Sequence, residues 1–438
     1  MLARLRLAWM RTRDSLWFLP GTFTVFAAVT AFALTQAELR GAFDVEVLRS
    51  WVFGGGVDGA RGMLQAIAGG LITVIGVVFS VTIVALQLAS SQFTPRVLRN
   101  FTSDRGNQLV LSVFIGTFTY TLLVLRTVRS ASDGESPFVP RVAVTLAVLL
   151  VLVSIGFLIF FINHSARSIQ VAAILDRVAA RTLGQVHRQF PERMGHADDA
   201  VPDPGVPGRE WATVTADAAG YLQVVDGRGL FRLGEGGGML IAMEPELGDF
   251  VLPGQALARV SPPGALDDEV RGRVRQAFVL GSERTPGQDT AFGLVEIADI
   301  AVKALSPGIN DPTTALQCID RLSEILLALG TRRAPDPWRT ERGEVHYLAR
   351  ELAFGRAVSV AFDQVRHYGA SNPVVASRLL AALARLAEQV PPARRTPLHA
   401  QGRAVLADAR ARTENAEDLA RVEEAGRPLW AACGTGVE

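Results

Sequence analysis

The sequence predicts an α-helical membrane domain of four spans, followed by a cytoplasmic α+β region with a small β barrel-sandwich-like module and a helical bundle. The chain of 438 residues is 49% hydrophobic and 20% charged, and its mean hydropathy is +0.25. This composition is too apolar for an ordinary soluble enzyme and too charged for a protein that lies wholly inside a bilayer. Four long uncharged stretches all lie in the first 166 residues, and strand-like and helix-like patterns follow them.

The four uncharged stretches are each long enough for a spanning helix, which needs roughly 20 apolar residues. The first follows an arginine-rich start, but its length and the lack of a clear cleavage site predict a retained helix rather than a signal peptide. The spans are expected at Ser15–Ala37, Gly62–Pro95, Gly106–Leu125 and Val142–Ala166.

The distribution of arginine predicts the orientation of these spans. Arginines lie in the N-terminal tail, in the second loop (Arg96, Arg99 and Arg105) and after the fourth span (Arg167). The other two loops mix arginine with aspartate and glutamate. Because cytoplasmic loops carry the excess of positive charge, both the N-terminus and the large C-terminal half are expected in the cytoplasm.

The second stretch has two unusual properties. Its uncharged run of about 34 residues would measure roughly 50 Å as a helix, whereas the hydrocarbon core of a bilayer is about 30 Å thick. Thr73, Ser80 and Gln87 recur every seven residues and therefore share one helix face, which we call the polar stripe, and Ser91 follows near its end. Two interpretations stay open: helix packing against a neighbouring span, or the lining of a pore in an oligomer.

The remainder of the chain divides by pattern into four segments. We expect the transmembrane domain at 1–166, a helical stalk and linker at 167–208, the β module at 209–262, the bundle at 263–425 and a flexible tail at 426–438. The order "GYLQVVD … GDFVLPGQALARV" resembles the barrel-sandwich hybrid module of lipoyl and biotinyl domains. Lys303 is the only lysine of the chain, so the lysine-borne swinging arm of those domains is excluded. The glycine-rich "RLGEGGGML" is expected to be a loop.

Four polar residues near residue 300 form a structural signature. Asp299 and Lys303 are one helical turn apart and are expected to pair. Asp311 precedes Pro312, which predicts an N-cap followed by the first residue of a helix, with Asn310 just before it. A hard-cation site is the alternative, but no established calcium-loop spacing is present. We therefore expect no metal and no cofactor.

Three motifs carry a resemblance to a known family. "FSVTIVALQLASSQFTPRVLRNF", "RTPGQDTAFG" and "LVEIADIAVKALSPGINDPTTALQCIDRL" resemble the bacterial membrane proteins called domain of unknown function 2254, over nearly the whole chain. The resemblance implies a bacterial inner-membrane protein with a cytoplasmic C-terminal region. It supplies no catalytic residues to transfer.

The function must therefore be argued from the residues. No nucleophile elbow, phosphate-binding loop, zinc helix or dinucleotide fingerprint is present, so we expect no enzyme, and a net charge of +1 gives no reason to expect nucleic acid. The first hypothesis is a homo-oligomeric channel or pore-like transport protein in contact with membrane lipid. The alternative is a membrane-anchored scaffold or sensor that binds a protein or small ligand through its cytoplasmic half.

Overall fold

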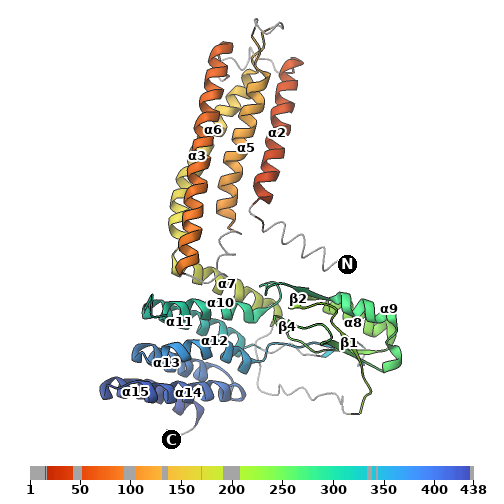
Figure 1. The fold of residues 1–438 in the computed structure, drawn as a ribbon, viewed down its shortest axis with the longest axis vertical. Helices are drawn as coiled ribbons and strands as arrows, with labels where there is room; N and C mark the ends of the chain where they lie inside the picture. Colours follow the sequence, from red (N-terminus) through yellow and green to blue (C-terminus); the bar gives the residue numbers. More distant parts are fainter. Residues whose placement is uncertain are drawn as a thin grey trace. The chain divides into compact units, whose positions relative to one another are not determined.

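The computed structural model describes residues 15, 17–42, 52–92, 104–130, 137–168, 170–190, 208–332, 338–341 and 344–434. The chain divides into two compact units, which meet in the sequence between Gln170 and Val171. The N-terminal unit contains four apolar helices, and the C-terminal unit contains further helices and two small sheets (Figure 1). The predicted order of four apolar helices followed by a mixed helical and sheet region is confirmed.

The described residues of the N-terminal unit include four helices that are long and apolar enough to cross a membrane. They are α2 (Phe18–Leu39), α3 (Val57–Gln92), α5 (Arg105–Thr127) and α6 (Arg141–Ser168). The second is overlong, as the sequence predicts, because α3 has 36 residues.

Helix α5 is the central helix of this unit and packs against α2, α3 and α6. Its buried residues include Phe114 and Tyr120. Gly116 faces α2, since a Cβ atom there would be in ordinary contact with the Phe23 carbonyl oxygen at 3.6 Å. The glutamate near the end of α2, Glu38, accepts hydrogen bonds from the backbone N–H groups of Val142 and Ala143 at 3.2 and 2.8 Å. These bonds satisfy donors that the start of α6 would otherwise leave unpaired.

The strands of the C-terminal unit form two sheets, of order β1-β5-β3-β8-β7 and β4-β2-β6. Strands β3 and β8 run parallel, whereas the other neighbours are antiparallel. One apolar core, which includes Leu222, Ile241 and Phe278, joins the sheets to α8 and α9. The elements are β1 (Ala212–Thr215), β2 (Gly220–Val225), α8 (Gly227–Gly237), β3 (Leu240–Met243), β4 (Phe250–Val251), β5 (Ala256–Ser261), α9 (Asp268–Ala277), β6 (Phe278–Gly281), β7 (Trp338–Glu341) and β8 (Glu344–Leu348).

Seven longer helices make up the rest of the C-terminal unit. They are α7 (Val171–Gln189), α10 (Thr290–Ala304), α11 (Pro312–Gly330), α12 (Phe354–Gly369), α13 (Pro373–Gln389), α14 (Arg395–Arg412) and α15 (Ala416–Cys433). Helix α7 packs on α10 and α11, and Arg181 of α7 pairs with the buried Glu296 of α10. The expected stalk is therefore corrected: α7 is an integral helix of this unit, because its apolar face, including Leu175 and Val178, is buried.

Three further expectations differ from the structure. The stretch expected as a glycine-rich loop forms α8, because Asp226 caps its start and Leu230 and Leu233 bury one face. Strands β6, β7 and β8 lie within 263–425, where only helices were expected. Helix α15 continues to Cys433 through Pro428, because Leu429 and Trp430 are buried, so most of the expected tail is helical. The linker residues 191–207 lie outside the described residues.

Candidate functional site

The polar stripe lies on the face of α3 that is directed away from the rest of the N-terminal unit. Leu64, Leu71, Val78 and Ala85 are buried and also recur every seven residues. Each stripe residue lies two residues after one of these buried residues in the sequence, and two residues correspond to a rotation of about 200° around a helix. Thr73, Ser80 and Gln87 are accordingly exposed. Among the residues that the structure describes, no other helix covers the stripe.

The same face of α3 carries small residues. Gly62, Gly69 and Gly76 have nothing within 4 Å of the position that a Cβ atom would occupy. The Thr73 hydroxyl donates to the Gly69 carbonyl at 3.0 Å, whereas Ser80 and Gln87 have no side-chain partner among the described residues. The side chain of Ser91 lies outside the described residues. Among the described residues this face is therefore uncovered, and it carries the exposed Val77 and Val84 beside the polar stripe.

A second candidate is a small cavity of about 50 Å³ in the C-terminal unit. Three loops line it: the β3–β4 loop, the segment between β6 and α10, and the loop from β8 to α12. Because β3 and β8 are parallel neighbours, their carboxyl ends meet at one edge of the sheet. Ligand sites often form at this edge of α/β structures.

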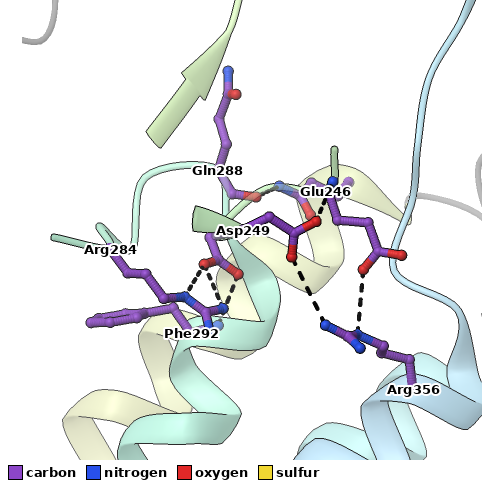
Figure 2. Close-up of polar contacts among 8 residues, drawn as sticks. Glu246, Asp249, Arg284, Gln288, Phe292 and Arg356 are labelled. Carbon is purple, nitrogen blue, oxygen red and sulfur yellow. Dashed lines mark hydrogen bonds and ion pairs between the residues drawn. The ribbon is translucent and has the colours of Figure 1, made fainter. Parts of the chain in front are cut away.

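The base of the cavity is the ion pair between Arg284 and Asp289 (Figure 2). Arg284 Nε donates to Asp289 Oδ2 at 2.8 Å, while Asp289 Oδ1 accepts from the Phe292 N–H at 3.0 Å and caps α10. Gly248 lies directly on this pair, and its φ of 88° suits only glycine. Burial raises the pKa of Asp289, while the charge of Arg284 acts against that rise. Asp289 is therefore structural, as one N-cap with one cationic partner.

Gln288 fastens the same segment to the sheet. Its side-chain oxygen accepts from the Val225 N–H at 2.9 Å, and its side-chain nitrogen donates to the Val225 carbonyl at 3.2 Å. This bidentate contact extends the ladder of β2 with a side chain. The signature "RTPGQDTAFG" thus supplies the joint between the sheets and α10.

The rim of the cavity carries looser charges. Arg356 of α12 lies 3.4 Å from Glu246 and 4.0 Å from Asp249 (Figure 2), and Arg350 donates to the Glu244 carbonyl at 2.8 Å. The capping residue of α12, Ala353, provides no side-chain hydrogen bond to the helix. An arginine held at these distances can exchange its partners for a charged ligand.

Sequence reasoning found the Arg284–Asp289 segment through its motif but missed Glu246, Asp249 and Arg356. These three lie on loops that only the fold brings together. Within the described residues, no group of three or more His, Cys, Asp or Glu side chains is arranged to hold a metal ion.

The predicted cap at Asp311 is confirmed: its carboxylate accepts from the Thr314 N–H at 3.1 Å, at the start of α11. Hydrogen bonds from Thr314 lower the pKa of this carboxyl group. Asn310 adopts a φ of 47°, a left-handed conformation that asparagine tolerates better than most residues. Lys303 lies half-buried in the last turn of α10, and its pairing with Asp299 stays a prediction.

Comparison with known proteins places the chain. Residues 13–385 match the family described as "Predicted membrane protein (DUF2254)". The uncharacterised protein Rv1290c of Mycobacterium tuberculosis (strain H37Rv) is 36% identical over 416 residues, which cover 94% of this chain and 79% of that protein. The uncharacterised protein Mb1321c of Mycobacterium bovis matches with the same identity and coverage. No solved structure matches the chain. The chain therefore belongs to the membrane protein family called domain of unknown function 2254.

Proposed function

We propose that the protein assembles as a homo-oligomer in the bacterial inner membrane and forms a channel or pore-like path beside α3. The observation that carries the proposal is the polar stripe, which is exposed on the side of α3 opposite to its buried column. An unpaired amide in hydrocarbon costs several kcal/mol. Either water or a neighbouring subunit must therefore meet this face.

The three stripe residues differ in how strongly they require water or a protein partner. Thr73 bonds to its own helix at Gly69, which reduces the cost of exposing its hydroxyl to lipid. Gln87 has a primary amide with two donors and an acceptor, none of them paired among the described residues. Ser80, in the middle of α3, discriminates best between a wet path and a dry seam.

Cysteine accessibility tests the proposal. In a chain with Cys318→Ser and Cys433→Ser, single cysteines replace Ser80 or its neighbours Phe79 and Val81. All three positions are exposed in the single chain, but the neighbours point about 100° to either side of Ser80. A pore predicts that a membrane-impermeant thiol reagent modifies the cysteine at position 80 and spares the other two. A packing seam predicts no modification, together with loss of the oligomer in Ser80→Leu. Equal modification at all three positions would contradict both.

We also propose the orientation: the N-terminus and the C-terminal unit lie in the cytoplasm. The arginines of the N-terminal tail, of the second loop and after the fourth span support it. In this arrangement the C-terminal unit supplies assembly contacts and gating on the cytoplasmic side. No catalytic role is assigned to it.

The second candidate function is a membrane-anchored sensor, favoured by the charged cavity between the sheets and α12. Its test is the thermal stability of the purified protein with acetate or inorganic phosphate present. A sensor predicts that one of these raises the melting temperature, and that Arg356→Ala removes the effect while Arg403→Ala, on an exposed face of α14, keeps it. The same shift in both variants would mean a nonspecific ion effect.

A further inference from the structure

The exposed large apolar side chains in the described part of the C-terminal unit form two groups. Phe250 and Leu252, exposed by 50% and 57%, lie where the chain passes from β4 to β5, a turn that we call the tip. Ile309 of the α10–α11 connection, Tyr368 in the last turn of α12 and Val374 in the first turn of α13 are exposed by 40%, 51% and 59%; we call them the end patch. Scattered apolar residues are normal on a surface, but here they gather at two places.

The tip is held by contacts with β2 and with the β1–β2 connection, and it has acidic neighbours. The Phe250 ring packs edge-on against Tyr221, with ring centres 5.0 Å apart. The Gly254 N–H donates to the Ala216 carbonyl at 2.9 Å, which brings the exposed Asp217 beside this turn. Asp249 adjoins Phe250 on its other side.

The end patch is continuous and has basic neighbours. Gly369 lies between its parts, since a Cβ atom there would lie 2.6 Å from Val375 Cγ1 and 3.2 Å from Leu305 Cδ1. The exposed Arg412 donates to the carbonyl of His367, next to Tyr368, at 2.7 Å. Lys303 lies in the last turn of α10, just before the α10–α11 connection.

The two surfaces lie at opposite ends of α10. This helix starts at the charged cavity, which Asp249 also lines, and it ends just before the connection that carries Ile309. Its 15 residues span about 22 Å. Since the tip and the end patch are different surfaces on one body, two copies that bring them together do so head to tail, and such contacts close into a ring or continue as a filament.

We propose that the tip of one subunit docks on the end patch of the next subunit, which builds a ring from the C-terminal units. Phe250 and Leu252 cover Ile309, Tyr368 and Val374, and the acidic margin with Asp217 faces the basic margin with Arg412. The proposal rests on the homo-oligomer proposed above, and it specifies a contact that the polar stripe does not involve.

Disulfide crosslinking in native membranes tests this contact. Two differently tagged chains without native cysteines are co-expressed, one with Leu252→Cys and the other with Val374→Cys. Oxidation should link the two tags, whereas neither variant should link to itself. A chain with both cysteines should give a ladder that ends at the size of the closed ring. The matched control pairs Leu252→Cys with Arg403→Cys on α14, which is also exposed but is not part of the end patch, and it should not crosslink.

A charge exchange sharpens the test. Asp217→Arg and Arg412→Glu should each lower the yield of the crosslink about two- to fivefold, the range expected for one surface ion pair, and together they should restore it. A detergent-solubilised oligomer without this crosslink would overturn the docking proposal and leave the oligomer standing. A monomeric mass in detergent would contradict both the docking proposal and the homo-oligomer. A disulfide between two Leu252→Cys chains would also overturn the docking proposal, because such a link indicates a symmetric contact between two tips.

Discussion

Removal of the Arg284 guanidinium should destabilise the C-terminal unit more than any other single arginine change proposed here. The side chain of Asp289 is only 3% exposed, that of Arg284 is 22% exposed, and their atoms approach to 2.7 Å. In Arg284→Met the methionine retains apolar contact with Phe292, over which the arginine lies, but the carboxylate is left buried without its cation. Such a loss costs about 3–5 kcal/mol. At about 2 °C per kcal/mol for a unit of this size, the melting temperature should fall by about 6–10 °C.

The assay is thermal unfolding of the whole protein in detergent, followed by near-ultraviolet circular dichroism. Asp289→Asn keeps an N-capping side chain and removes the charge, so the double variant Arg284→Met/Asp289→Asn should recover part of the loss. Arg403→Met, an exposed arginine, should change the melting temperature by about 1 °C or less. Strictly additive losses in the double variant would show that the two side chains are not coupled.

The same variant should acquire a characteristic pH dependence. Burial already raises the pKa of Asp289, and without Arg284 the rise should be larger. A group with a raised pKa binds protons more tightly in the folded state, so stability falls as pH rises above the unfolded value of about 3.9. The loss in Arg284→Met should therefore be smaller at pH 5 than at pH 8, and a loss independent of pH would contradict this origin.

Three further outcomes are expected. Asp311→Ala should lower the free energy of unfolding by about 1 kcal/mol through loss of the α11 cap. Because the pKa of Asp311 is lowered in the fold, the stabilisation by this carboxylate is present above pH of about 4 and is lost as the pH falls further. A destabilisation by Asp311→Ala that persists in acid would contradict the charged cap. The methyl group of Gly293→Ala would overlap the Thr182 hydroxyl and should destabilise the fold by about 1–3 kcal/mol. The control is Gly272→Ala, at a helical glycine with open space around it, which should be neutral or stabilising. Equal shifts of the melting temperature in the two variants would refute the overlap at Gly293. Topology reporters fused after Ala37, Gln92, Asp133 and Arg193 should read outside, inside, outside and inside, in that order. An outside reading after Arg193 would contradict the cytoplasmic location of the C-terminal unit.

Much of the architecture follows from local patterns in the sequence. The four apolar helices are predictable because a spanning helix needs only length and low charge. The stripe on α3 is equally readable, since a seven-residue repeat of Thr73, Ser80 and Gln87 keeps one face whatever that face meets. The cap at Asp311 follows from two adjacent residues, Asp311 and Pro312.

The missed features depend on contacts between distant segments. Strand β8 looks like the start of an amphipathic helix, and it becomes a strand because it pairs with β3. Glycine content hides α8, although Asp226 and the spacing of Leu230 and Leu233 carry its signal. No local pattern connects Glu246 with Arg356, so the charged cavity appears only in the folded chain.

Conductance of the purified oligomer in a planar lipid bilayer tests the central claim most directly. The account predicts that a protein whose only cysteine replaces Ser80 conducts, and that a charged, water-soluble methanethiosulfonate blocks that current. The matched protein with its cysteine in place of Val81 should conduct and resist the block, because that side chain points about 100° away from the stripe. An oligomer that carries no current, or one blocked equally at both positions, would contradict the assignment of a conducting path to this face of α3.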